Sequence, residues 1–145
     1  ASEWLNKGEY NSTSALNPVQ RDMSFCKRIC IVEDSGLIAE DFRLTLSETG
    51  YEVEAYSGLA ALEQPDAWYC GFDAAVVDLD FDTPDCLRAM ARFSASDVPV
   101  ALLTGLDPED LPRPARQHLR IDKPIANARL RAVAQRLTHL SQHPE

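Results

Sequence analysis

The sequence contains no long apolar run. Within its 145 residues, no stretch approaches the roughly 20 consecutive apolar residues that a membrane-spanning helix needs. The first residues show no signal-peptide pattern, and internal repeats and low-complexity tracts are also absent. We therefore expect a cytoplasmic protein, most simply a single domain with a substantial core.

Positive charge is scarce in this chain. Lys and Arg number 14 against 23 Asp and Glu residues, which gives a formal net charge of −9. A nucleic-acid surface needs clustered Lys and Arg, and anionic membranes also attract basic surfaces. The charge balance therefore argues against both kinds of partner. The share of apolar residues, 45%, is ordinary for a globular domain.

The cysteines lack the spacing of a metal or redox site. Cys26, Cys30, Cys70 and Cys86 form no CxxC pair and have no clustered histidines nearby. Such a distribution favours reduced, mostly buried thiols over disulfides or a metal site.

Residues 1–25 differ from the rest of the chain. They are polar and show little periodicity, so we expect a flexible extension outside the core. From Cys26 onward, short apolar runs alternate with helical patterns. Residues 26–145 are therefore expected to form the folded domain.

Strand and helix patterns alternate along this domain. Strands are expected in RICIVED, YEVEAYS, FDAAVVDLD, VPVALLTG and HLRIDKP, and helices in SGLIAEDFRLTLSETG, GLAALEQ, PDCLRAMARFSA and IANARLRAVAQRLTHL. Repeated β-α units imply a parallel sheet with right-handed crossovers and helices on both faces. The predicted fold class is α/β, with a doubly wound, five-stranded parallel sheet. Ligands bind such sheets at the carboxyl ends of the strands.

The segment before the fifth strand is rich in proline. Pro108, Pro112 and Pro114 lie within GLDPEDLPRPARQHLRID. Proline is tolerated in the first turn of a helix but breaks its interior. The fourth helix of the repeat should therefore be short, displaced or missing.

Polar residues follow the predicted strands where a ligand site is expected. Glu33 and Asp34 end the first strand, Asp78 the third, Thr104 the fourth and Lys123 the fifth. Neighbouring carboxylates repel one another and favour a hard divalent cation such as Mg²⁺. A hydroxyl and an ammonium group can donate to phosphoryl oxygens. The set is suited to placing a phosphoryl group on an Asp carboxylate.

With these residues in this order, the sequence resembles the receiver domains of two-component response regulators over roughly residues 27–140. The resemblance is carried by Glu33-Asp34, Asp78, Thr104 followed by a small residue, and Lys123-Pro124. It implies a flavodoxin-like sheet with strand order 2-1-3-4-5. It also implies a phosphorelay signalling module that is not an enzyme beyond catalysing its own aspartyl phosphorylation and dephosphorylation.

The resemblance also assigns roles. Asp78 would accept a phosphoryl group from a histidine kinase or a histidine phosphotransfer protein, and the modified module would change its binding to a downstream protein partner. Lys123 and Thr104 would contact the phosphoryl group.

The magnesium ligands implied by the resemblance are Asp34, Asp78 and the backbone carbonyl of Asp80. Glu33 would act through water in the outer shell of the ion.

One residue departs from the receiver pattern. Arg120 stands three residues before the lysine, where receivers usually carry Tyr or Phe. A guanidinium is always charged and cannot fill an apolar slot as a ring does. A degenerate receiver that binds a protein partner independently of phosphorylation is therefore an alternative.

A haloacid dehalogenase-like phosphohydrolase is a further alternative. The run DLDFD places two Asp residues two positions apart after a strand, as that family does. That motif normally opens its domain, however, whereas two β-α units precede it here. The cognate kinase, the output and homodimer formation are left open by the sequence.

Overall fold

The computed structural model describes residues 26–79 and 83–141. Five strands form one parallel sheet in the order β2-β1-β3-β4-β5. The predicted α/β fold with strand order 2-1-3-4-5 is therefore confirmed. Residues 1–25, predicted to be an extension, lie outside the described residues. The strands are β1 (Arg28–Val32), β2 (Glu52–Tyr56), β3 (Ala74–Asp78), β4 (Val100–Thr104) and β5 (Leu119–Asp122).

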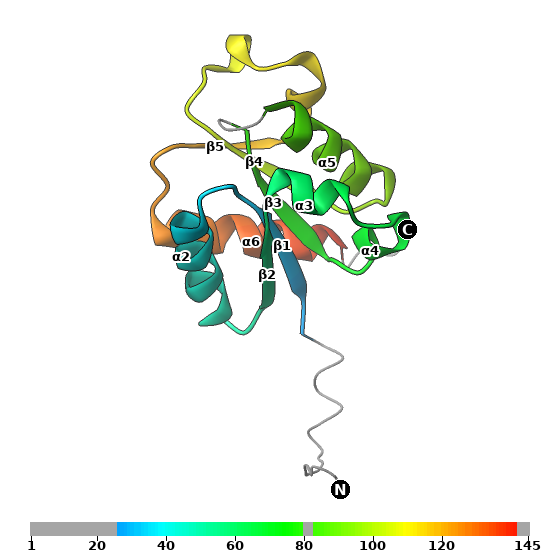
Figure 1. Cartoon of the computed structure of the whole chain (residues 1–145). Coiled ribbons are helices and arrows are strands. Elements are labelled where there is room, and N and C mark those ends of the chain that lie inside the picture. The colour runs from blue at the N-terminus through cyan, green and yellow to red at the C-terminus, as the bar shows by residue number, and fades with distance from the viewer. Residues whose placement is uncertain (1–25, 80–82, 142–145) are drawn as a thin grey trace, which may run out of the picture.

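Helices cover both faces of the sheet (Figure 1). One face carries α2 (Gly36–Ser47) and α6 (Asn127–Ser141), and the other carries α3 (Gly58–Leu62), α4 (Asp66–Tyr69) and α5 (Thr83–Ala95). The sequence predicted only one short helix between β2 and β3. Pro65 stands at the N-cap of α4, so the segment forms two short helices instead. Among the described residues, no helix combines the length and apolarity that crossing a membrane requires.

The central strands are buried because helices pack on both of their faces. All five residues of β3 and all five of β4 are buried. Alternate side chains of each strand point to opposite faces, so the strands contribute to two apolar clusters. Val76 and Leu103 pack with α2 and α6, whereas Val77 and Leu102 pack with α3, α4 and α5.

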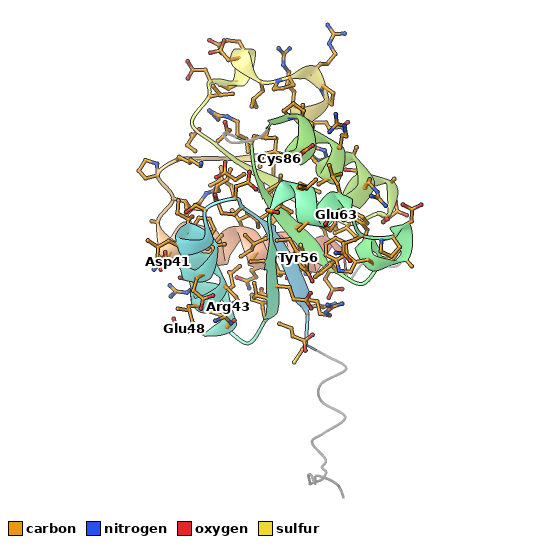
Figure 2. The ribbon with its side chains drawn as sticks, viewed as in Figure 1. Asp41, Arg43, Glu48, Tyr56, Glu63 and Cys86 are labelled. Carbon is orange, nitrogen blue, oxygen red and sulfur yellow. The ribbon has the colours of Figure 1, made fainter. Side chains whose placement is uncertain are left out.

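The two helices on the first face follow their predicted patterns with one exception. The hydroxyl of Ser35 caps α2 by accepting a hydrogen bond from the backbone N–H of Ile38 at 3.4 Å. Figure 2 shows Asp41 on the outer surface of α2 and Glu48 at its C-terminal end, and both residues are exposed. Leu140 has the helical spacing of the apolar stripe formed by Leu130, Val133 and Leu137 in α6, but it is 53% exposed. The last turn of the helix therefore leaves this residue outside the apolar cluster.

An aromatic cluster fills the second face. The ring of Trp68 lies 4.9 Å from Tyr56, 4.8 Å from Tyr69 and 4.9 Å from Phe72, between ring centroids. Phe93 of α5 completes the cluster at 4.7 Å from Tyr69. Edge-on aromatic contacts of this kind add to the stabilisation that burial provides.

The proline-rich segment contains no α-helix within the described residues 105–118. Two 3₁₀ turns, η2 (Pro108–Asp110) and η3 (Arg113–Ala115), replace it, and each has proline near its start. The prediction of a short or irregular fourth helix is therefore confirmed. Leu111 and Ala115 are buried against the aromatic side of the core, so the segment still covers the sheet.

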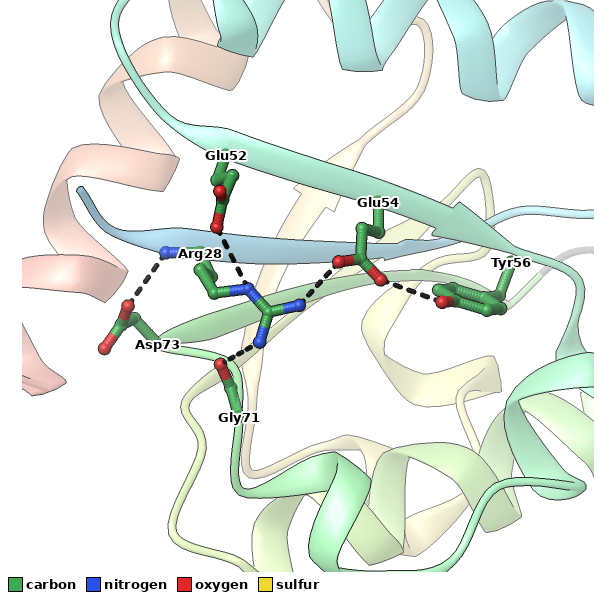
Figure 3. Close-up of polar contacts among 6 residues, drawn as sticks. All are labelled: Arg28, Glu52, Glu54, Tyr56, Gly71 and Asp73. Carbon is green, nitrogen blue, oxygen red and sulfur yellow. Dashed lines mark hydrogen bonds and ion pairs between the residues drawn. The ribbon is translucent and has the colours of Figure 1, made fainter. Parts of the chain in front are cut away.

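Arg28 of β1 contacts both β2 and the segment that leads into β3 at the amino end of the sheet (Figure 3). Its backbone N–H donates to the Asp73 carboxylate at 2.8 Å, and its guanidinium donates to the Gly71 carbonyl at 2.7 Å. The guanidinium also forms ion pairs with Glu52 at 3.2 Å and Glu54 at 2.5 Å. A Cβ atom at position 71 would lie 2.8 Å from the guanidinium, so a larger residue there would displace the Arg28 side chain.

The four cysteines are all free. Cys30 and Cys86 are buried and Cys26 is partly buried, but Cys70 is exposed at the end of α4. The prediction of mostly buried thiols is therefore wrong for Cys70.

Candidate functional site

The polar residues singled out in the sequence lie at one rim of the sheet. Glu33 follows β1, Asp78 ends β3, Thr104 ends β4 and Lys123 follows β5. Because all strands are parallel, their carboxyl ends meet at the same edge. The sheet order puts β3 between β1 and β4, so Asp78 lies at the centre of this rim.

Asp78 and Lys123 form an ion pair at this rim. The Lys123 Nζ atom donates to Asp78 Oδ2 at 2.8 Å, and the Asp78 side chain is only 2% exposed. A buried carboxylate is costly unless a charge or a hydrogen-bond donor compensates it. The Lys123 ammonium supplies this compensation for the buried Asp78 side chain.

Glu33 lies beside this pair and is also buried, at 4% exposure. Its Oε2 accepts the backbone N–H of Ser35 at 3.2 Å, whereas its buried Oε1 has no hydrogen-bond partner among the described residues. Burial, together with the Asp78 carboxylate next to it, raises the pKa of Glu33 to about 7. Burial and the neighbouring carboxylate thus favour the protonated form of Glu33.

The raised pKa of Glu33 predicts that stability depends on pH. The ordinary pKa of this group is 4.5 and the folded value is about 7, so the folded state binds the proton more tightly. Without a metal ion, the free energy of unfolding should fall as pH rises from about 4.5 to about 7 and then level off. Urea unfolding of the wild type and Glu33→Gln in chelator, across this range, measures the effect.

Glu33→Gln should lose this pH dependence, whereas Glu40→Gln should keep it. Glu40 is an exposed carboxylate whose pKa is lowered by its hydrogen bonds to Arg43 on α2. If the free energy of unfolding of the wild type and of Glu33→Gln changed identically with pH, the assignment of this pH dependence to Glu33 would be wrong.

Asp34 is exposed at the rim, and its carboxylate is fixed from the neighbouring loop. Its Oδ1 accepts the backbone N–H of Gly58 at 3.0 Å. Gly58 begins α3, where the Ser57 hydroxyl caps the helix by accepting from the backbone N–H of Ala60. The sequence analysis missed Gly58. The signal that could have found it is the Ser-Gly pair directly after β2.

Thr104 is fully buried at the end of β4. Its hydroxyl oxygen accepts the backbone N–H of Leu106 at 3.0 Å, and its carbonyl accepts the backbone N–H of Lys123 at 3.1 Å. Thr104 therefore links the loop after β4 to the residue that carries the ammonium group.

The Arg120 side chain is only 24% exposed and pairs with a carboxylate. One guanidinium nitrogen lies 2.6 Å from Asp122 Oδ1, and the buried Nε has no hydrogen-bond partner among the described residues. Arg120 stands opposite Leu102 in the sheet register, beneath the segment that forms the 3₁₀ turns. A charged side chain thus occupies the edge of the sheet near Thr104.

The carboxylates at the rim fit a magnesium ion. Within residues 26–79 and 83–141, no three acidic, imidazole or thiol side chains are gathered closely enough to hold a metal by themselves. Mg²⁺ needs only one or two carboxylates because it keeps several waters. Two oxygens at the rim could take part in such a site. Glu33 Oε1 is buried without a hydrogen-bond partner among the described residues, and Asp34 is exposed. Asp80, expected to add a carbonyl ligand, lies outside the described residues.

The chain matches no protein-family model and no curated protein sequence. Solved structures, by contrast, match most of it. A response regulator receiver protein of Sinorhizobium medicae is 22% identical, with a TM-score of 0.65 over 81% of this chain and 98% of that chain. A CheY-like receiver domain of Methylobacillus flagellatus is 26% identical, with a TM-score of 0.63 over 77% and 98%.

The chemotaxis response regulator CheY4 of Vibrio cholerae is 25% identical, with a TM-score of 0.64 over 77% of this chain and 98% of that chain. These likenesses support a signalling module rather than a metabolic enzyme. The chain therefore has the fold of the response regulator receiver (CheY-like) domains, as the motifs at its strand ends predict.

Proposed function

We propose that this chain is a phosphoacceptor module of a two-component system, with Asp78 as the acceptor. The ion pair between Lys123 and the buried Asp78, at the central strand end of a receiver fold, carries the proposal. The donor would be a phosphohistidine of a histidine kinase or of a histidine phosphotransfer protein. The modified module would then bind a downstream partner differently.

In the proposed reaction, a carboxylate oxygen of Asp78 attacks phosphorus. The bond from phosphorus to the donor imidazole breaks, and an acyl phosphate forms on Asp78. The Lys123 ammonium is placed to move from the carboxylate to the new phosphoryl oxygens. The Thr104 hydroxyl can donate a hydrogen bond to the same group.

Mg²⁺ would be held by Asp34 and Asp78, with Glu33 bonded through water. When bound, the ion neutralises negative charge on the phosphoryl oxygens as they approach the acidic rim. Asp34 is already oriented by the Gly58 N–H, and Glu33 by the Ser35 N–H. Asp34 therefore needs little rearrangement to act as a ligand, and Glu33 to bond through water in the outer shell.

A cavity beside Lys123 supports a protein as phosphodonor. It has a volume of about 520 Å³ and lies between α2 and the segment that joins β5 to α6. Its walls are mainly apolar, and Ile38 on its rim is 39% exposed. An apolar side chain of a protein that presents phosphohistidine to Asp78 could insert here.

The alternative of a phosphorylation-independent interaction module rests on a specific observation. Arg120 pairs with Asp122 where an aromatic ring would otherwise lie, and 3₁₀ turns stand in place of the fourth helix. A chain with these features could present a fixed binding surface whether or not Asp78 is modified.

Intact-mass measurement after incubation with acetyl phosphate separates these functions. We expect the wild type to gain one phosphoryl group only when Mg²⁺ is present, and Asp78→Asn to gain none. No Mg²⁺-dependent gain on the wild type would favour the interaction module. Turnover of phosphomonoesters would instead indicate the phosphohydrolase.

A further inference from the structure

A polar cavity lies at the amino end of the sheet, opposite the phosphoacceptor rim. Its volume is about 250 Å³, and it is lined by residues that precede β1 and β2 and by the last turns of α6. We name it the basal pocket. Its lining residues are Lys27, Tyr51, Gln135, Thr138 and His139.

The basal pocket offers hydrogen-bond donors, and none of the described residues that line it carries a carboxylate. Lysine, histidine, tyrosine, glutamine and threonine side chains can all donate. The chain as a whole has a net charge of −9, whereas this cavity is lined by a lysine and by side chains that can donate hydrogen bonds. Its charge and donors suit an anion.

Lys27 is the main positive charge of the basal pocket. Within the described residues its ammonium makes no hydrogen bond or ion pair. The acidic side chain of Glu52, next to Tyr51 in the sequence, is instead paired with Arg28 at 3.2 Å. The Lys27 ammonium is therefore available to a ligand.

The floor of the pocket is a buried hydroxyl. Thr138 is 4% exposed, and its Oγ1 donates to the Ala134 carbonyl at 2.9 Å. The Tyr51 hydroxyl lies 3.4 Å from this oxygen, which is long for a bond between hydroxyls. A ligand oxygen could therefore compete for the Tyr51 proton at little cost.

We propose that the basal pocket binds a small oxyanion, either phosphate or a small polycarboxylate. Lys27 supplies positive charge, and Tyr51, Gln135 and the His139 imidazole line the pocket with groups that can donate hydrogen bonds. Carbonyl groups at the C-terminal end of a helix disfavour anions, so the ligand lies against Lys27 and Tyr51 rather than against the end of α6. The volume is below the about 300 Å³ at which pockets for larger organic ligands begin.

The test follows the imidazole signals of the protein by NMR at constant ionic strength. Phosphate and citrate are titrated separately, with chloride as the reference, and the His139 signal is assigned with His139→Gln. We expect the His139 signal to shift saturably with one or both oxyanions. His118 lines a different cavity, which Asp97 also lines, so the His118 signal should not shift saturably with either oxyanion.

Matched charge removals complete the test. Lys27→Gln should weaken binding by about fivefold or more, as loss of a partly exposed charge pair does. Arg136→Gln removes an exposed charge of α6 that does not line the pocket, and should change binding by less than about twofold. Asp78→Asn should bind normally, because the inference does not depend on phosphoryl transfer.

Three results would overturn the inference. The first is that the His139 signal shows no saturable shift with either oxyanion. The second is that the His118 and His139 signals shift equally. The third is that Lys27→Gln and Arg136→Gln weaken oxyanion binding equally. A response to phosphate alone or to citrate alone supports the site and identifies the class of its ligand.

Discussion

Lys123→Ala is expected to slow the phosphorylation of Asp78 by about a hundred- to a thousandfold. This is the usual loss of rate when one preorganised hydrogen-bond donor to a developing oxyanion is removed. The ammonium lies 2.8 Å from Asp78 Oδ2, so it is placed to stabilise charge on the transferred phosphoryl oxygens. The measurement is the initial rate of mass gain with acetyl phosphate and saturating Mg²⁺.

Two variants separate this role from a general loss of positive charge. Lys123→Arg keeps the charge, but its planar guanidinium cannot copy the compact ammonium, so an intermediate rate is expected. Lys27→Ala removes an ammonium at the other end of the sheet and should leave the rate unchanged. If Lys123→Ala were labelled as fast as the wild type, with its thermal unfolding intact, the proposed role of Lys123 would be wrong.

Phe93→Ala is expected to lower the free energy of unfolding by about 3–5 kcal/mol, the usual cost of truncating a buried phenylalanine. Phe93 is fully buried, with its ring centroid 4.7 Å from Tyr69 and 5.9 Å from Trp68. Domains of this kind are stable by only about 5–15 kcal/mol, so the loss is a large fraction of the total. Urea unfolding followed by circular dichroism measures it.

The control for this experiment is Leu59→Ala on α3. Leu59 is 57% exposed, so its truncation leaves no cavity in the core and should cost less than about 1 kcal/mol. If both variants unfolded at the same urea concentration as the wild type, the aromatic cluster would not be a major source of stability.

The same cluster supports the functional rim. Ala61 of α3 is buried within it, and α3 begins at Gly58, whose N–H orients Asp34. Loss of packing under α3 in Phe93→Ala therefore changes a proposed magnesium ligand as well as stability.

The sequence by itself was sufficient for the order of the five strands and for placing the candidate site residues at one rim of the sheet. Alternating apolar runs and helical patterns predicted the parallel sheet, and Asp78 and Lys123 could be assigned to its rim because parallel strands end at one edge. The prolines after Thr104 predicted the irregular fourth helix, since their effect on the backbone is local.

Tertiary structure alone decided which side chains meet. The hydrogen bond from Gly58 to Asp34 and the contacts of Arg28 with Gly71 join segments that lie far apart in the chain. The burial of Glu33 likewise depends on segments that pack around it. Leu140 shows the same limit, because helical periodicity places it on the apolar stripe of α6 although it is 53% exposed. Local patterns fix the direction of a side chain relative to its own helix or strand, but its neighbours, and hence its charge state and its ligands, depend on how these elements pack.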